Sequence, residues 1–169
     1  MKKGDLATKR GFTIIEVSLV LAIAGLIFLM VMIALPALQR NTRDTQRKED
    51  ISALVAAVKK YQTNNRGALP TGDGSNWNIA LGNYLGDGFI DPDGTNYNLT
   101  VENCANSTDK PCSGVEGNMG DFPNNYKLYI VTQARCSGSE TSGALGSSNP
   151  RKFAVLYRLE GGGLYCEDG

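Results

Sequence analysis

The chain has 169 residues, which is enough for one modest globular domain and an anchor but not for two full domains. Its 17 basic and 17 acidic residues give a formal net charge of zero, so the composition gives no reason to expect a polyanion-binding protein. It contains no histidine, no phosphate-binding loop and no nucleophile motif, so we expect that it is not an enzyme.

The N-terminal region combines a basic segment with a long apolar run. Residues 1–11 are basic and end at Gly11, and no charged residue occurs from Val17 to Leu38. As a helix, the run of about 22 residues would measure about 33 Å, which matches the hydrocarbon core of a bilayer. An ordinary signal peptide has a shorter apolar stretch followed by a small-residue cleavage site, so we expect this run to remain as a single membrane span. The basic flank predicts a cytoplasmic N-terminus.

Glu16 is the one carboxylate at the start of this apolar run. A charge in a membrane is costly and needs a partner, but the neighbouring sequence offers none before Arg10. Cleavage after Gly11 would create an amine on Phe12, about one helical turn from Glu16. That amine could pair with Glu16 of the same chain or of a neighbouring copy.

The segment KRGFTIIE, together with the apolar run after it, resembles the signature of type IV prepilins. In that family a membrane peptidase cuts after the glycine and methylates the new N-terminal residue. The resemblance implies that Gly11 is the cleavage glycine, that Phe12 is methylated, and that Glu16 guides assembly together with Phe12. It also implies that Gly25 and Pro36 loosen the helix in filaments. Pro36 lacks a backbone donor and is expected to weaken the preceding turn.

After the leader (residues 1–11) and the assembly helix (residues 12–38), residues 39–65 read as an amphipathic continuation of the same helix. Residues 39–50 are highly charged, and we expect a solvated face with local ion pairs there, with a binding patch as the alternative. The helix is predicted to run from about Thr13 to Asn64. Its apolar stripe has helical spacing and comprises Ile51, Leu54, Val55, Val58 and Tyr61.

Residues 66–169 are predicted to form a globular, β-rich head. The fold class expected is α+β and pilin-like, with one long N-terminal helix packed against a small antiparallel sheet. Alternating residues favour a strand at Lys152–Leu159, and the three glycines after it favour a tight reversal. The predicted elements are a short helix at Trp77–Leu85 and strands at Tyr97–Val101, Lys127–Thr132, Lys152–Leu159 and Leu164–Cys166.

The segment FIDPDGTNYNL, residues 89–99, resembles the turn before the first strand of the major pseudopilins of type II secretion. Asp87, Asp91 and Asp93 raise the hypothesis of a calcium site, because hard cations favour clustered carboxylates. The terminal glutamate of the common calcium loop is missing, so we favour a structural turn and expect no cofactor.

Four cysteines in the second half of the chain predict two disulfides, because this part is expected to lie outside the membrane. We favour the pairs Cys104–Cys112 and Cys136–Cys166, although three pairings are open. If Lys127–Thr132 pairs directly with Lys152–Leu159, Cys136 and Cys166 could lie too far apart to bond. A zinc site is the alternative, but no C-x-x-C pair occurs.

The resemblance implies a structural role as the major pilin of a type IV pilus. The chain would start in the cytoplasmic membrane, be cut by prepilin peptidase, and form a homo-oligomeric helical filament outside the cell with the pilus assembly machinery. Adhesion and twitching motility would be properties of that filament. One alternative is a minor pilin or pseudopilin of a type II secretion or competence (DNA-uptake) apparatus. Another is a membrane-tethered ligand-binding ectodomain.

Three basic residues near one end of the predicted sheet, Arg135, Arg151 and Lys152, could form the basic spot that a DNA-binding minor pilin needs. A long polar segment separates Arg135 from the other two residues. We therefore do not expect nucleic-acid binding.

Overall fold

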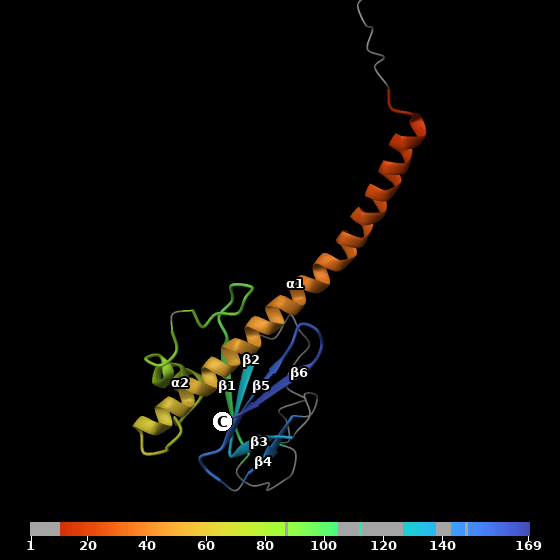
Figure 1. The fold of residues 1–169 in the computed structure, drawn as a ribbon. Coiled ribbons are helices and arrows are strands. Elements are labelled where there is room, and N and C mark those ends of the chain that lie inside the picture. The colour runs from red at the N-terminus through yellow and green to blue at the C-terminus, as the bar shows by residue number, and fades with distance from the viewer. Residues whose placement is uncertain (1–10, 87, 105–111, 113–126, 138–142, 148) are drawn as a thin grey trace, which may run out of the picture. The chain divides into compact units, whose positions relative to one another are not determined.

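The computed structural model describes residues 11–86, 88–104, 112, 127–137, 143–147 and 149–169. The chain divides into two compact units, Met1–Gln39 and Arg40–Gly169. Helix and sheet are both present, which confirms the predicted α+β class (Figure 1). The elements are α1 (Ile14–Asn64), α2 (Gly74–Leu81), β1 (Asn98–Asn103), β2 (Lys127–Thr132), β3 (Ala134–Cys136), β4 (Ala144–Gly146), β5 (Phe153–Arg158) and β6 (Leu164–Asp168).

The first unit contains the apolar half of α1. Its described residues are all exposed, and this part of the helix is long and apolar enough to cross a membrane. The helix begins within one residue of the predicted start and is not interrupted at Gly25 or Pro36. The loosening that the pilin resemblance implies for a filament therefore stays a prediction.

The second unit contains a four-stranded sheet with the order β1-β2-β5-β6 and a two-stranded sheet of β3 and β4. β5 pairs antiparallel with both of its neighbours, but β1 pairs parallel with β2. The prediction of an antiparallel sheet is therefore wrong for β1. Residues 104–126 separate β1 from β2, which exceeds the roughly dozen residues that a parallel crossover needs.

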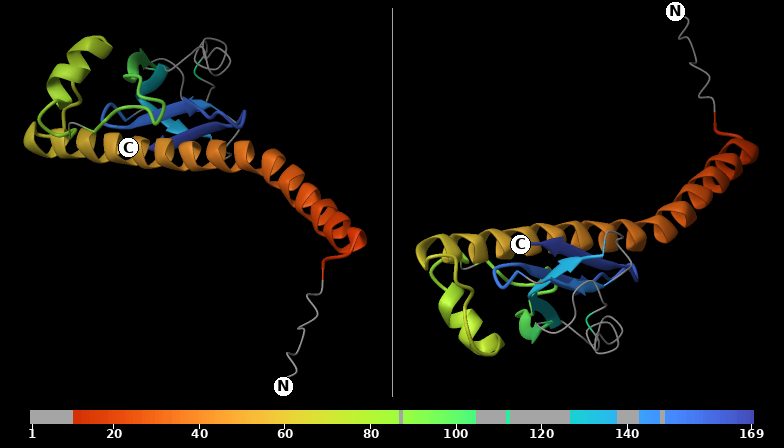
Figure 2. Two further views of the ribbon diagram at one scale, coloured as in Figure 1. Left: turned by 90° about the horizontal axis from the view of Figure 1, so that it is seen from above. Right: turned by 90° about the horizontal axis from the view of Figure 1, so that it is seen from below.

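One face of the four-stranded sheet packs against the second half of α1, which runs alongside the strands in both views of Figure 2. The predicted apolar stripe supplies the helix side of this core, while alternate residues of β5 supply the sheet side. Its fully buried members include Ile51, Leu54, Val58, Trp77, Phe153, Val155 and Tyr157.

The opposite face of the same sheet is also buried. The other buried residues of β5, Ala154 and Leu156, pack in a second cluster that includes Tyr129, Ala134 and Ala144. β5 therefore has apolar neighbours on both sides, and the alternation in its sequence separates two cores rather than a core from solvent.

The head contains the disulfides Cys104–Cys112 and Cys136–Cys166, which are the pairs that the sequence favoured. β2 does pair directly with β5, the arrangement that made the second bond doubtful. Gln133 has a positive φ of 54°, which turns the chain out of β2 and into β3. β3 then lies against β6, with the Cys136 N–H donating to Asp168 Oδ1 at 2.6 Å.

The short helix α2 begins and ends earlier than the predicted range Trp77–Leu85. Asp73 caps its start, since its Oδ1 accepts a hydrogen bond from the Asn76 N–H at 3.1 Å. The helix closes at Gly82. β1 begins one residue later and ends two residues later than predicted, whereas β2 has the predicted bounds.

Candidate functional site

The predicted processing and assembly residues lie at the start of α1. Gly11 and Phe12 precede the helix and are exposed, and Glu16 lies in its first turn. Residues 1–10 of the predicted leader are outside the described residues. Glu16 Oε2 accepts hydrogen bonds from the Thr13 N–H at 2.9 Å and from Thr13 Oγ1 at 2.8 Å. In return, the Glu16 N–H donates to Thr13 Oγ1 at 3.3 Å.

This reciprocal pattern is a capping box, with Thr13 as the N-cap and Glu16 three residues later. Thr13 was not among the predicted functional residues, although the T-x-x-E pattern before an apolar run is the signature of a capping box. The capping box directs the Glu16 carboxylate back towards Thr13, which is next to Phe12 in the chain. Its second oxygen, Oε1, accepts no hydrogen bond from the part of the chain that the structure describes.

The apolar surface beyond Glu16 is extensive. Phe12 is 89% exposed, and the large hydrophobic side chains from Ile14 to Leu38 are between 45% and 91% exposed. A helix that is apolar on every side is not stable in water by itself, so it needs lipid or other helices around it. Glu16 is the one charged residue within residues 11–38.

A second polar arrangement lies between α1 and the head, around Arg47. Its guanidinium is fully buried and makes a two-pronged contact with Asp91, from Nε to Oδ2 and from Nη2 to Oδ1, both at 2.9 Å. Its Nη1 donates to Asp44 at 3.0 Å and to Glu160 at 3.2 Å. The prediction of a solvated face is therefore wrong for Arg47 and Asp44, because Asp91 and the turn after β5 cover this part of the helix.

Asp44 and Arg43 complete this arginine cluster, which comprises Arg43, Asp44, Arg47, Asp91 and Glu160. Asp44 accepts hydrogen bonds from the backbone N–H groups of Glu160 and Gly161, each at 2.9 Å. Arg43 donates two hydrogen bonds to Glu160. These bonds, followed by those from Arg47, lower the pKa of the Glu160 carboxyl below its usual 4.5.

Two buried tyrosines extend the polar contacts. Tyr157 donates from its hydroxyl to Asp91 at 3.0 Å, and Tyr97 donates to Asp50 at 2.8 Å. Burial raises the pKa of both tyrosines, so both hydroxyls stay protonated and remain donors. The cluster and its tyrosines connect α1 to β5 and to the residues around Asp91 without leaving an unpaired charge.

The predicted calcium residues do not come together as a site. Asp91 is occupied by Arg47 and Tyr157, and Asp93 Oδ1 accepts from the backbone N–H and the hydroxyl of Thr95. Asp87 is outside the described residues. In the described ranges no group of three or more His, Cys, Asp or Glu side chains could hold a metal ion. The segment forms a turn, as favoured from the sequence, with Gly94 at a φ of 89°.

The predicted basic spot is only partly assembled. Arg151 and Lys152 line one pocket, whereas Arg135 lies on β3 and is not among the residues that line it.

Comparison with known proteins assigns no relative to this chain, since no protein-family model, no curated protein and no solved structure matches it.

Proposed function

We propose that this chain is a structural subunit of a type IV pilus filament, matured by cleavage after Gly11 and methylation of Phe12. The observation that carries the proposal is the exposed apolar first half of α1 with one carboxylate in its first turn. The major pilin is the form we favour. The minor pilin and the pseudopilin share the same helix and differ in abundance.

The geometry of Glu16 supports assembly through this helix. In lipid the apolar side chains already have an apolar solvent, so helix packing alone gives little specificity. The open Oε1 of Glu16 offers an acceptor to an amine, and cleavage would provide one on Phe12 of a neighbouring copy. Pairing these charges would fix the axial position of one helix against the next.

The head supports a role outside the membrane. Its two disulfides require an oxidising compartment, which fits a domain exported beyond the cytoplasmic membrane. The buried arginine cluster joins this head to the second half of α1. The Arg47 guanidinium donates to the Asp91 carboxylate, and the Asp44 carboxylate accepts from two backbone N–H groups of the head. The head is therefore carried rigidly on the part of the helix that follows Gln39.

Mass spectrometry of the N-terminus of protein taken from cells tests this proposal directly. We expect a chain that begins at Phe12 and carries one methyl group on its amine. A mature chain that retains Met1, or that begins after Leu38, contradicts the proposal.

Substitutions of Glu16 separate its charge from its capping role. Glu16→Gln keeps a capping-box side chain but removes the charge, whereas Glu16→Ala removes both. We expect both variants to be inserted in the membrane yet absent from filaments sheared off the cell surface. Filaments of normal yield from Glu16→Gln would mean that the charge has no role in assembly. In wild-type cells, abundant subunit in the sheared fraction indicates a major pilin, and scarce subunit indicates a minor pilin or pseudopilin.

A further inference from the structure

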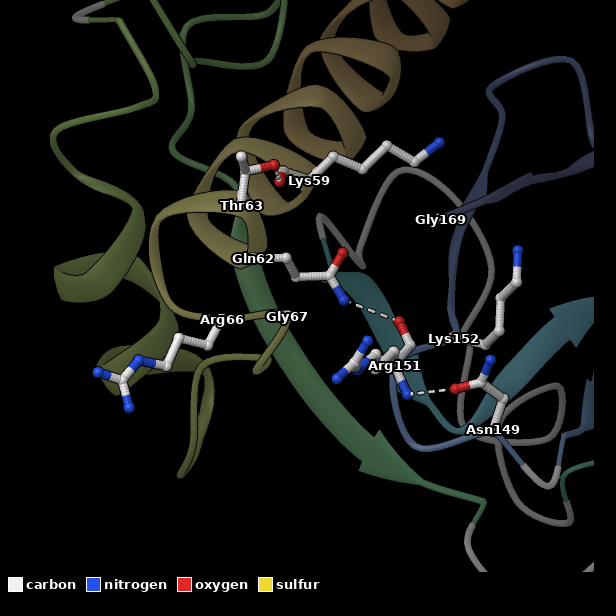
Figure 3. A pocket seen from close by; sticks show the side chains of 9 residues that line it. All are labelled: Lys59, Gln62, Thr63, Arg66, Gly67, Asn149, Arg151, Lys152 and Gly169. Carbon is white, nitrogen blue, oxygen red and sulfur yellow. Dashed lines mark hydrogen bonds between the residues drawn. The ribbon is translucent and has the colours of Figure 1, made fainter.

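A pocket of about 460 Å³ lies on the head between the C-terminal end of α1 and the segment that precedes β5. Figure 3 shows Lys59 entering from the helix, Arg151 and Lys152 entering from the opposite side, and Arg66 pointing away from these three. The remaining lining residues are uncharged at their side chains, namely Gln62, Thr63, Gly67, Asn149 and Gly169.

The positive charges of this pocket are not neutralised by the described residues. The ion pairs found in these parts of the chain all involve Arg40, Arg43 or Arg47, and none involves a residue that lines the pocket. Lys59 donates to a neutral acceptor, the Asp168 carbonyl, at 3.4 Å. The pocket therefore has a positive surplus from Lys59, Arg151 and Lys152.

The backbone of Arg151 is held by two hydrogen bonds, and its side chain is exposed. Gln62 Nε2 donates to its carbonyl at 2.8 Å, and its own N–H donates to Asn149 Oδ1 at 2.9 Å (Figure 3). Its guanidinium lies over Gly67, where an added Cβ would come within 3.0 Å of two guanidinium atoms. Gly67 also has a positive φ of 84°, so this close approach depends on glycine for two reasons.

We propose that this pocket binds a small phosphate-bearing ligand. Cations that gather without counterions repel one another, and an anion with several oxygens relieves this repulsion. The Arg151 guanidinium and the ammonium groups of Lys59 and Lys152 line the same pocket, and both kinds of cation donate hydrogen bonds to phosphate oxygens. Lys59, Arg151 and Lys152 all line this one pocket and Arg135 does not, which favours a compact ligand over a polymer.

The test uses the full chain in zwitterionic detergent micelles and inorganic pyrophosphate as the probe. Backbone amide NMR signals of Gly67, Arg151 and Gly169 are followed at constant ionic strength. We expect saturable shifts at these residues. The double variant Lys59→Gln/Lys152→Gln should weaken binding about tenfold or more, because each lost charge removes a charge-assisted contact.

The matched control, Lys60→Gln/Lys127→Gln, removes the same number of charges from exposed positions outside the pocket. We expect it to change pyrophosphate affinity less than about twofold. Equal weakening by the two double variants, or shifts that do not saturate, would overturn the proposal. Tighter binding of duplex DNA, with shifts that extend to Lys60 and Lys127, would also overturn it in favour of a polymer track.

Discussion

Arg47 in the middle of α1 and Asp91, 44 positions later, form a buried two-pronged ion pair with both N···O distances at 2.9 Å. The exposed fraction of each side chain is 1% or less. The pair joins the helix to the head at a point where the sequence shows only a run of charges. Its loss should therefore have a large effect on the stability of the head.

Replacement of Arg47 by Met should lower the free energy of unfolding by about 3–5 kcal/mol, since it leaves Asp91 buried without its cation. Urea unfolding of the full chain can be followed by the fluorescence of Trp77, the single tryptophan, which is fully buried. Arg40→Met is the control, because the Arg40 side chain is 60% exposed and pairs with Glu160 only at 3.8 Å. A change in Arg47→Met as small as that of the control would show that the pair does not stabilise the head.

Acid should weaken the arginine cluster through Glu160. The hydrogen bonds from Arg43 and Arg47 lower its pKa in the folded state below 4.5. Its stabilising contribution is therefore fully present above about pH 4.5 and is lost as the pH falls through the folded-state pKa. We expect the free energy of unfolding to decline on acidification below pH 4.5, and to decline less steeply in Glu160→Gln. Parallel pH profiles for the two proteins would contradict this assignment.

The two disulfides should differ in their contribution to stability. Cys136 and Cys166 are 30 residues apart, whereas Cys104 and Cys112 are 8 apart. The loop-closure relation gives about 3.5 kcal/mol for the longer loop and about 2.5 kcal/mol for the shorter one. Paired Cys→Ser variants of each bond, compared by urea unfolding, should show the greater loss for Cys136–Cys166. The reverse order would indicate that strain or residual structure outweighs loop length.

Gly74 should not tolerate a side chain. An added Cβ would lie 1.7 Å from the carbonyl oxygen of Leu99, so α2 and β1 would have to separate. We expect Gly74→Ala to destabilise the head by about 1–3 kcal/mol. Gly82→Ala at the end of the same helix is the control, because the nearest atom there would be 3.4 Å away. Thermal unfolding of the two variants gives the comparison, and equal midpoints would contradict the expected clash.

The sequence predicted those elements whose pattern is local. The extent of α1 follows from its apolar run and its helical stripe, and β2 follows from a compact apolar segment between polar ones. The hairpin of β5 and β6 follows from alternation and the three glycines between the strands. β3 and β4 have three residues each, too few for any periodicity to appear.

The burial of Arg47 could not be read from its neighbours in the chain. Arg47 lies in a highly charged segment of the helix, and such a segment is typical of a solvent-exposed face. Its partners Asp91 and Glu160 come 44 and 113 positions later in the chain. Only the tertiary fold brings these groups together. The capping box of Thr13 and Glu16, in contrast, spans three residues and was available from the sequence alone.

The turn between β5 and β6 is hydrogen-bonded to α1. The backbone N–H groups of Glu160 and Gly161 both donate to the Asp44 carboxylate of that helix. Protein engineering at this turn therefore has a defined limit. A dye-labelling side chain at Gly163 lies beyond both donors, and an added Cβ there would meet no atom closer than 4.0 Å. An insertion placed before Gly161 would separate the two donors that share the Asp44 carboxylate.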